Sequence, residues 1–84
     1  MIRYLIRNDK GEYQYSRTNV GGYYDYRTTY GKDINNARLF TRKCSATNSL
    51  NYNNTIAYML KRFGIIVPKN MRVVEVEVNL NELS

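Results

Sequence analysis

The chain begins with an alternation of apolar and polar residues. Residues 2–7 (IRYLIR) place Ile2, Tyr4 and Ile6 on one face, which is the period of a half-buried β-strand. Residues 8–11 (NDKG) favour a tight turn, because Asn, Asp and Gly tolerate the backbone angles that hairpin turns need. Residues 12–17 continue as the returning strand. The pattern therefore predicts a β-hairpin over residues 2–17.

Two further segments also have the period of a strand. Residues 23–29 follow the breaker at residues 19–22 and are rich in aromatic and β-branched side chains, which favours a third strand. Residues 71–80 alternate valines with Glu75 and Glu77. The valines are predicted to point inward and the glutamates outward, where they would suit a place beside Arg3 and Arg7 of the first strand.

The middle of the chain changes to helical spacing. Asp33 is a predicted N-cap, followed by Ile34, Ala37, Phe40 and Cys44 at intervals that fit one helix face. Cys44 would then be a small buried hydrophobic residue. Residues 47–54 are polar and are predicted to form a loop or a frayed helix end.

A second helix is predicted over residues 54–63. Ile56, Met59, Leu60 and Phe63 follow the i, i+3, i+4, i+7 pattern of an amphipathic helix. Gly64 stands where a glycine commonly ends a helix.

The predicted order of elements is β-β-β-α-α-β within one small domain, residues 1–84. We expect an α+β fold with a four-stranded, mainly antiparallel sheet and both helices packed on one face. The opposite, open face would carry tyrosines and arginines.

Composition narrows the class of protein. One cysteine and no histidine exclude an internal disulfide and a zinc site of the usual Cys/His kind within one chain. No apolar run approaches the roughly 18 residues of a membrane span, and the N-terminus does not resemble a signal peptide. We therefore expect a soluble protein of the cytoplasm, with no membrane partner and no cofactor, and the sequence does not set its oligomeric state.

The formal net charge is +6. Residues 1–43 contribute +5 of it and residues 44–84 contribute +1. A positive field of this kind attracts polyanions.

The basic first half also holds seven of the nine tyrosines. Tyrosine rings stack on bases and arginines bind phosphates, so the combination is typical of sites for single-stranded nucleic acid. The alternatives are that the tyrosines are core and edge residues of a small sheet, and that the basic residues near position 40 form a solvated helix face. Candidate phosphate-binding residues are Arg17, Arg27, Arg38, Arg42 and Lys43. Candidate stacking residues are Tyr13, Tyr15, Tyr24 and Tyr26.

Catalysis has little support, because histidine is absent and no pair of carboxylates is evident. Small basic RNA-cleaving toxins of the RelE type are similar in size and charge. Their helices lie near the start of the chain, whereas here three strands come first. We therefore expect a binding protein and not an enzyme.

Residues 4–13 (YLIRNDKGEY) and 36–43 (NARLFTRK) resemble segments of small accessory and counter-defence proteins of T4-like tailed phages. That resemblance implies a phage protein in the host cytoplasm that binds RNA and inhibits a host defence factor, such as the RNA-cleaving toxin of a toxin–antitoxin system. The alternative is an inhibitor that binds a host protein directly, without nucleic acid.

Overall fold

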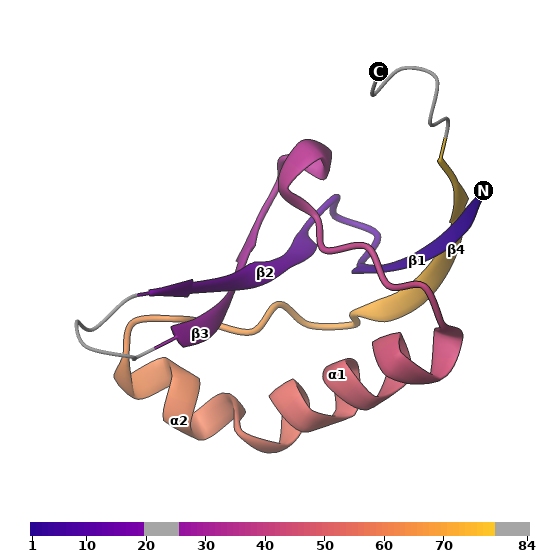
Figure 1. Ribbon diagram of the computed structural model, residues 1–84. Coiled ribbons are helices and arrows are strands. Elements are labelled where there is room, and N and C mark those ends of the chain that lie inside the picture. The colour runs from indigo at the N-terminus through magenta and orange to yellow at the C-terminus, as the bar shows by residue number, and fades with distance from the viewer. Residues whose placement is uncertain (20–25, 79–84) are drawn as a thin grey trace.

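A computed structural model describes residues 1–19 and 26–78 of the chain. Its strands are β1 (Ile2–Arg7), β2 (Tyr13–Asn19), β3 (Tyr26–Gly31) and β4 (Arg72–Glu77). Its helices are the 3₁₀ turn η1 (Ile34–Asn36), α1 (Lys43–Thr55) and α2 (Ala57–Arg62). The strands form one antiparallel sheet in the order β3-β2-β1-β4, and α1 and α2 follow one another along one side of it (Figure 1). The predicted α+β class and element order are confirmed.

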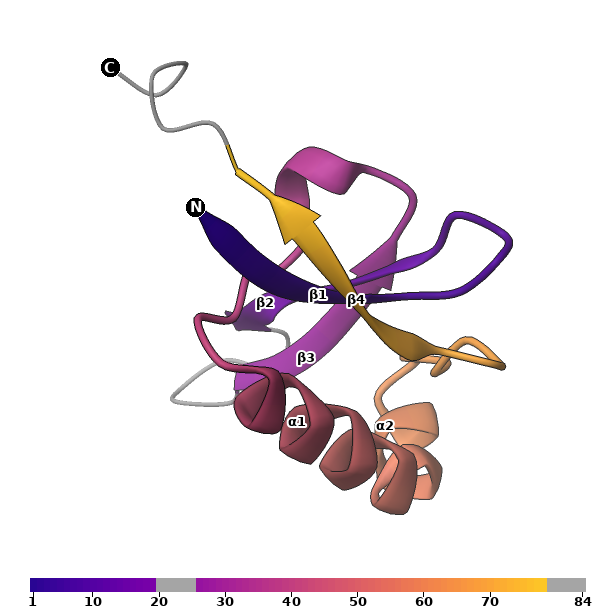
Figure 2. The same cartoon turned by 90° about the vertical axis from the view of Figure 1, so that its right-hand side faces the viewer.

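A segment of extended chain separates the two halves of the sheet. β1 and β2 pair where the hairpin closes, at Arg7 and Tyr13. Farther along, residues 37–40 run between them, bridging Tyr4 through Phe40 and Tyr15 through Ala37. The sheet therefore consists of two strand pairs, β1–β4 and β2–β3, which cross at a steep angle in Figure 2.

The main core lies between β1, β4 and the start of α1. Ile6, Phe40 and Ala46 are buried together, and partly buried neighbours pack against them. Those neighbours are Tyr4, Leu50, Met71 and Val73. Burial of these side chains holds the first turns of α1 against the sheet, at roughly 25 cal/mol per Å² of apolar surface removed from water.

Both faces of β1 are covered at its centre. Leu5 and Ile6 are 2% and 0% exposed, and consecutive residues of a strand point to opposite faces of a sheet. Leu5 pairs with Val74 and Ile6 with Val73. The prediction of one open face is therefore wrong for this part of the sheet, because Leu5 on one face and Ile6 on the other are both buried.

The hairpin turn is organised by Asn8, which is 2% exposed. Its Oδ1 accepts hydrogen bonds from the backbone N–H groups of Lys10 and Glu12, each at 3.0 Å. Its Nδ2 donates to Glu12 Oε1 and to the carbonyl of Lys69, both at 3.0 Å. Gly11 has the predicted positive φ, at 75°. One amide side chain thus joins the β1–β2 turn to the turn that precedes β4.

Next to this turn, Asp9 and Arg72 form an ion pair of 2.6 Å. The hydrogen bond from Arg72 and its positive charge hold the pKa of Asp9 below its ordinary value.

The glutamates of β4 are exposed and Val74, Val76 and Val78 are half-buried, as predicted. The predicted place of this strand beside the strand of Arg3 and Arg7 is confirmed, since β4 pairs with β1. The register sets Arg3 opposite Val76 and Arg7 opposite Arg72, so the glutamates do not lie directly across from these arginines.

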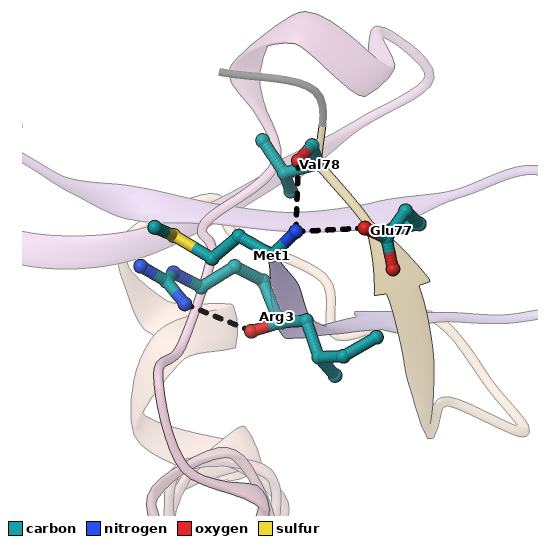
Figure 3. Close-up of polar contacts among 5 residues, drawn as sticks. Met1, Arg3, Glu77 and Val78 are labelled. Atoms are coloured by element: carbon teal, nitrogen blue, oxygen red, sulfur yellow. Dashed lines mark hydrogen bonds and ion pairs between the residues drawn. The ribbon is translucent and has the colours of Figure 1, made fainter.

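Polar contacts of Met1 join the start of β1 to the end of β4. The ammonium group of Met1 donates to Glu77 Oε1 at 2.7 Å and to the Val78 carbonyl at 3.3 Å (Figure 3). In the same view, Arg3 Nη1 donates to the neighbouring carbonyl of Ile2.

The helix predicted from Asp33 to Cys44 does not form. Asp33 does cap a helical turn, since its Oδ1 accepts from Asn35 N at 2.9 Å, but η1 ends at Asn36. Beyond it the backbone bonds to the sheet: Arg38 N donates to the Gln14 carbonyl at 3.0 Å, and Phe40 N donates to the Tyr4 carbonyl at 2.7 Å. The backbone hydrogen-bonding groups between β1 and β2 need partners, and residues 37–40 supply them by remaining extended.

The first long helix occupies the segment predicted as a loop. In α1 the face toward the sheet is marked by Ala46, Leu50 and Asn53, at spacings of four and three, and by Ser49, whose Oγ accepts a hydrogen bond from Gln14 Nε2 of β2 at 2.8 Å. Asn53 Nδ2 donates to the Ser49 carbonyl at 2.8 Å, so a polar side chain is accommodated within the helix. Cys44 is exposed, and its predicted burial is wrong because the helix starts only at Lys43.

The second predicted helix is confirmed as α2, and its end has the geometry of a Schellman motif. Gly64 has φ of 80°, its N–H donates to the Lys61 carbonyl, and Ile65 N donates to the Leu60 carbonyl. Leu60 is buried as predicted. Met59 and Phe63, predicted inward, are instead 39% and 46% exposed, because so short a helix packs on the sheet through Leu60.

Among the described residues, no helix is long and apolar enough to cross a membrane.

Candidate nucleic-acid interface

Arg17, an exposed residue of β2, lies where two surface hollows meet. One hollow lies between the sheet and the helices, and Arg27, Tyr52 and Asn53 contribute to its walls. The other is lined by Ser16, Arg17 and Arg38. The structure thus brings together three of the five predicted phosphate-binding residues, although they are 21 positions apart in the chain.

A third hollow extends this surface toward η1. It is lined by Tyr15, Ser16, Asn35, Asn36 and Ala37, and it shares Ser16 with the hollow beside Arg38. The three hollows therefore form a continuous path along β2. We call this path the β2 track and define it by the residues Tyr15, Ser16, Arg17, Arg27, Asn35, Asn36, Arg38, Tyr52 and Asn53.

Two arginines of the track are held by aromatic rings. The guanidinium carbon of Arg38 lies 4.5 Å from the ring centroid of Phe40, and that of Arg27 lies 4.4 Å from the ring centroid of Phe63. Both distances are within the range of a cation–π interaction. The ring beneath Arg38 limits the freedom of that side chain and leaves the edge donors of its guanidinium able to point at an anion.

Asn53 places a polar group in the wall of the hollow beside Arg17. It is 3% exposed, and its Oδ1 has no hydrogen-bond partner among the described residues. The orientation of the amide follows from Nδ2, which donates to the Ser49 carbonyl. An unpartnered acceptor at this position favours a ligand or water that donates a hydrogen bond.

One of the two tyrosines of the track, Tyr52, is not among those that the sequence singled out. Tyr52 is 55% exposed at the rim of the hollow beside Arg17. Sequence analysis placed Tyr52 in a loop and gave it no role. Had the helix been recognised, the position of Tyr52 next to the inward-facing Asn53 would have indicated that its ring lies at the edge of the hollow.

Of the predicted stacking residues, Tyr15 lies in the track but also has a structural contact. Its half-buried ring lies against Gly31, and its hydroxyl accepts a hydrogen bond from Asp33 N at 2.8 Å. Tyr13 lies where the hairpin closes, opposite Gly31 of β3. Tyr24, and the side chain of Tyr26, lie outside what the structure describes.

Arg42 and Lys43 lie apart from the track. They are exposed at the start of α1, whereas Tyr52 is ten residues beyond Arg42, about 15 Å along a helix axis. Arg38 and Arg42 both fall within the helix predicted from Asp33 to Cys44, but they do not share a helix, because Arg38 belongs to the extended segment before α1.

The positive charge is concentrated in the middle of the chain. Residues 34–74, which include both helices, contain seven basic residues and no acidic one. The rest of the chain has six basic and seven acidic residues. Three of the seven basic residues lie in α1 and α2, and the others lie in the connecting segments and in β4.

Within the described ranges, no three Cys, Asp or Glu side chains lie close enough together to hold a metal ion.

No protein family, curated protein or solved structure matches this chain.

Proposed function

We propose that the protein binds single-stranded RNA along the β2 track, without catalysis. The observation that supports this most directly is the convergence of Arg17, Arg27 and Arg38 on linked hollows beside the exposed ring of Tyr52. Cationic side chains that follow a path, together with an aromatic platform, are the common features of sites for single-stranded nucleic acid.

On this proposal the arginines bind phosphates and Tyr52 stacks on a base. Arg42 and Lys43 would add attraction at a distance without belonging to the track.

The resemblance to phage counter-defence proteins suggests a biological role for this binding. We propose that the protein inhibits a host defence factor, such as an RNA-cleaving toxin, by occupying RNA or an RNA-bound complex. Protection of cells in which such a toxin is induced should then require Arg17.

Fluorescence anisotropy with a labelled single-stranded RNA, recorded over a series of salt concentrations, tests the proposal. Three phosphate contacts predict a slope of log affinity against log salt of about −2, whereas contacts from all five predicted basic residues would give about −3.5. Arg17→Ala should weaken binding at every salt concentration and make the slope shallower.

The double substitution Arg42→Ala/Lys43→Ala is the matched control, because it removes two positive charges outside the track. It should weaken binding less than Arg17→Ala does. Tyr52→Ala should cost about 1–3 kcal/mol of binding free energy, whereas Tyr52→Phe retains most of the stacking. Equal effects of Arg17→Ala and the control would contradict the proposal that RNA binds along the track. Absence of RNA binding at low salt would contradict the proposed function itself.

A further inference from the structure

The second helix presents apolar side chains to solvent. Tyr58, Met59, Phe63 and the following Ile66 are 65%, 39%, 46% and 74% exposed. Scattered apolar residues are normal on protein surfaces, but a group of four on so short a segment marks an interaction site. We call these four residues the α2 patch.

The backbone places three members of the patch on one side of α2. Positions 58, 59, 62 and 63 lie within about 140° of one another around a helix, and Arg62 occupies the fourth of them. Leu60 points to the opposite side and is 1% exposed. Tyr58 and Met59 are therefore turned away from the side that Leu60 buries, whereas the ring of Phe63, at the C-cap, also contacts Arg27 of β3.

The patch is anchored by defined contacts. Two backbone hydrogen bonds close the helix, from Gly64 N to the Lys61 carbonyl at 3.1 Å and from Ile65 N to the Leu60 carbonyl at 3.0 Å. The ring of Phe63 is also held by Arg27 of β3. A surface that is ordered before binding loses less conformational entropy when a partner docks.

The charges around the patch select the chemistry of the partner. Lys61 and Arg62 are exposed within the same helix, and no acidic residue occurs anywhere in residues 34–74. A second copy of this chain would bring like charges together, which opposes docking. An acidic surface would meet only positive charge here. α2 has six residues, so it offers little apolar area to a membrane surface, where binding strength scales with the apolar area buried.

We infer that the α2 patch docks an acidic amphipathic helix of a partner protein. Apolar side chains of that helix would cover the patch, and its carboxylates would meet Lys61 and Arg62. This surface adjoins the β2 track through Arg27 and is distinct from it in chemistry, because the track lacks exposed aliphatic side chains.

Nuclear magnetic resonance of the full ¹⁵N-labelled chain tests this inference with two synthetic helical peptides of equal negative charge. One carries leucines along one face among glutamates, and the other has serine at each leucine position. The leucine peptide should give saturable shifts centred on the amides of the α2 patch, with an affinity at least tenfold higher than that of the serine peptide. Equal binding of both peptides, binding of neither, or shifts centred elsewhere would overturn the inference.

Matched variants separate docking from folding. Tyr58→Ser combined with Ile66→Ser removes the two most exposed side chains of the patch. This double substitution should lower the affinity for the leucine peptide roughly tenfold or more. Ile34→Ser is the control, since Ile34 is 57% exposed in η1, outside the patch. An equal loss in the control would overturn the inference. Two further results would overturn it. Shifts of the patch amides that depend on protein concentration alone would indicate self-association, and shifts that appear only with vesicles of anionic lipid would indicate membrane binding.

Discussion

The ring of Tyr15 in β2 lies against the α-carbon of Gly31 in β3, so closely that a methyl group at position 31 would overlap the phenol. The contact aligns the end of β3 with β2, and the Tyr15 hydroxyl also binds the N–H of Asp33, where η1 begins. Gly31→Ala should therefore destabilise the protein by about 1–3 kcal/mol through overpacking. Urea denaturation measures this loss.

A second substitution tests whether steric overlap is the cause. In a Tyr15→Ala background the additional change Gly31→Ala should cost far less than it does in the native protein, because the overlapping ring is gone. Gly64→Ala provides a contrast. Position 64 has open space but φ of 80°, so its cost of about 1–2 kcal/mol comes from the left-handed backbone and should not depend on Tyr15. Equal costs of Gly31→Ala in both backgrounds would contradict the steric explanation.

Asn8→Ala should reduce the free energy of unfolding by about 2 kcal/mol or more, since it removes four hydrogen bonds of a buried amide and leaves backbone groups without partners. Chemical denaturation gives the value. Lys10→Ala, in the same turn, alters an exposed side chain and should change stability by less than 0.5 kcal/mol or so. Similar effects of the two substitutions would show that Asn8 does not organise the turn.

Burial raises the pKa of Tyr30 from 10.0 to about 12. The unfolded chain then loses this proton at lower pH than the folded protein does. The stabilising contribution of Tyr30 is complete below pH 10 or so and is lost as the pH rises from about 10 to about 12. The melting temperature of the native protein should fall more steeply over this range than that of Tyr30→Phe. Parallel pH profiles of the two proteins would count against the shift.

The exposure of Cys44 predicts fast reaction of its thiol with a disulfide reagent such as DTNB under native conditions. The rate should be close to that of the urea-unfolded chain, since opening of the fold is not required. Strong protection in the native state would instead support the burial that the helical spacing suggested.

Strong local patterns in the sequence predicted much of the fold. Alternation identified β1, and Gly64 marked the end of α2. The position of α1 was missed because its inward face has few apolar side chains. It includes the polar Asn53, the small Ala46 and one larger apolar residue, Leu50. The extended path through Phe40 was missed for a different reason: its hydrogen-bond partners lie in strands 24 or more positions away.

The candidate site shows the same limit. Arg17, Arg27 and Arg38 were identified by residue type, but their convergence depends on residues 37–40 entering the sheet. Tyr52 was overlooked because its helix was not recognised.

The pairing of β1 with β4 sets when this protein can finish folding. Ile2 lies beside Glu77 and Arg7 beside Arg72, so half of the sheet joins segments separated by almost the whole chain. During synthesis, β1 cannot pair with β4 until residues 72–77 have left the ribosome. Contacts this distant slow folding, and an unpaired strand is prone to aggregate in the meantime. The β1–β4 half of the sheet therefore forms late, after every other described strand and helix has been synthesised.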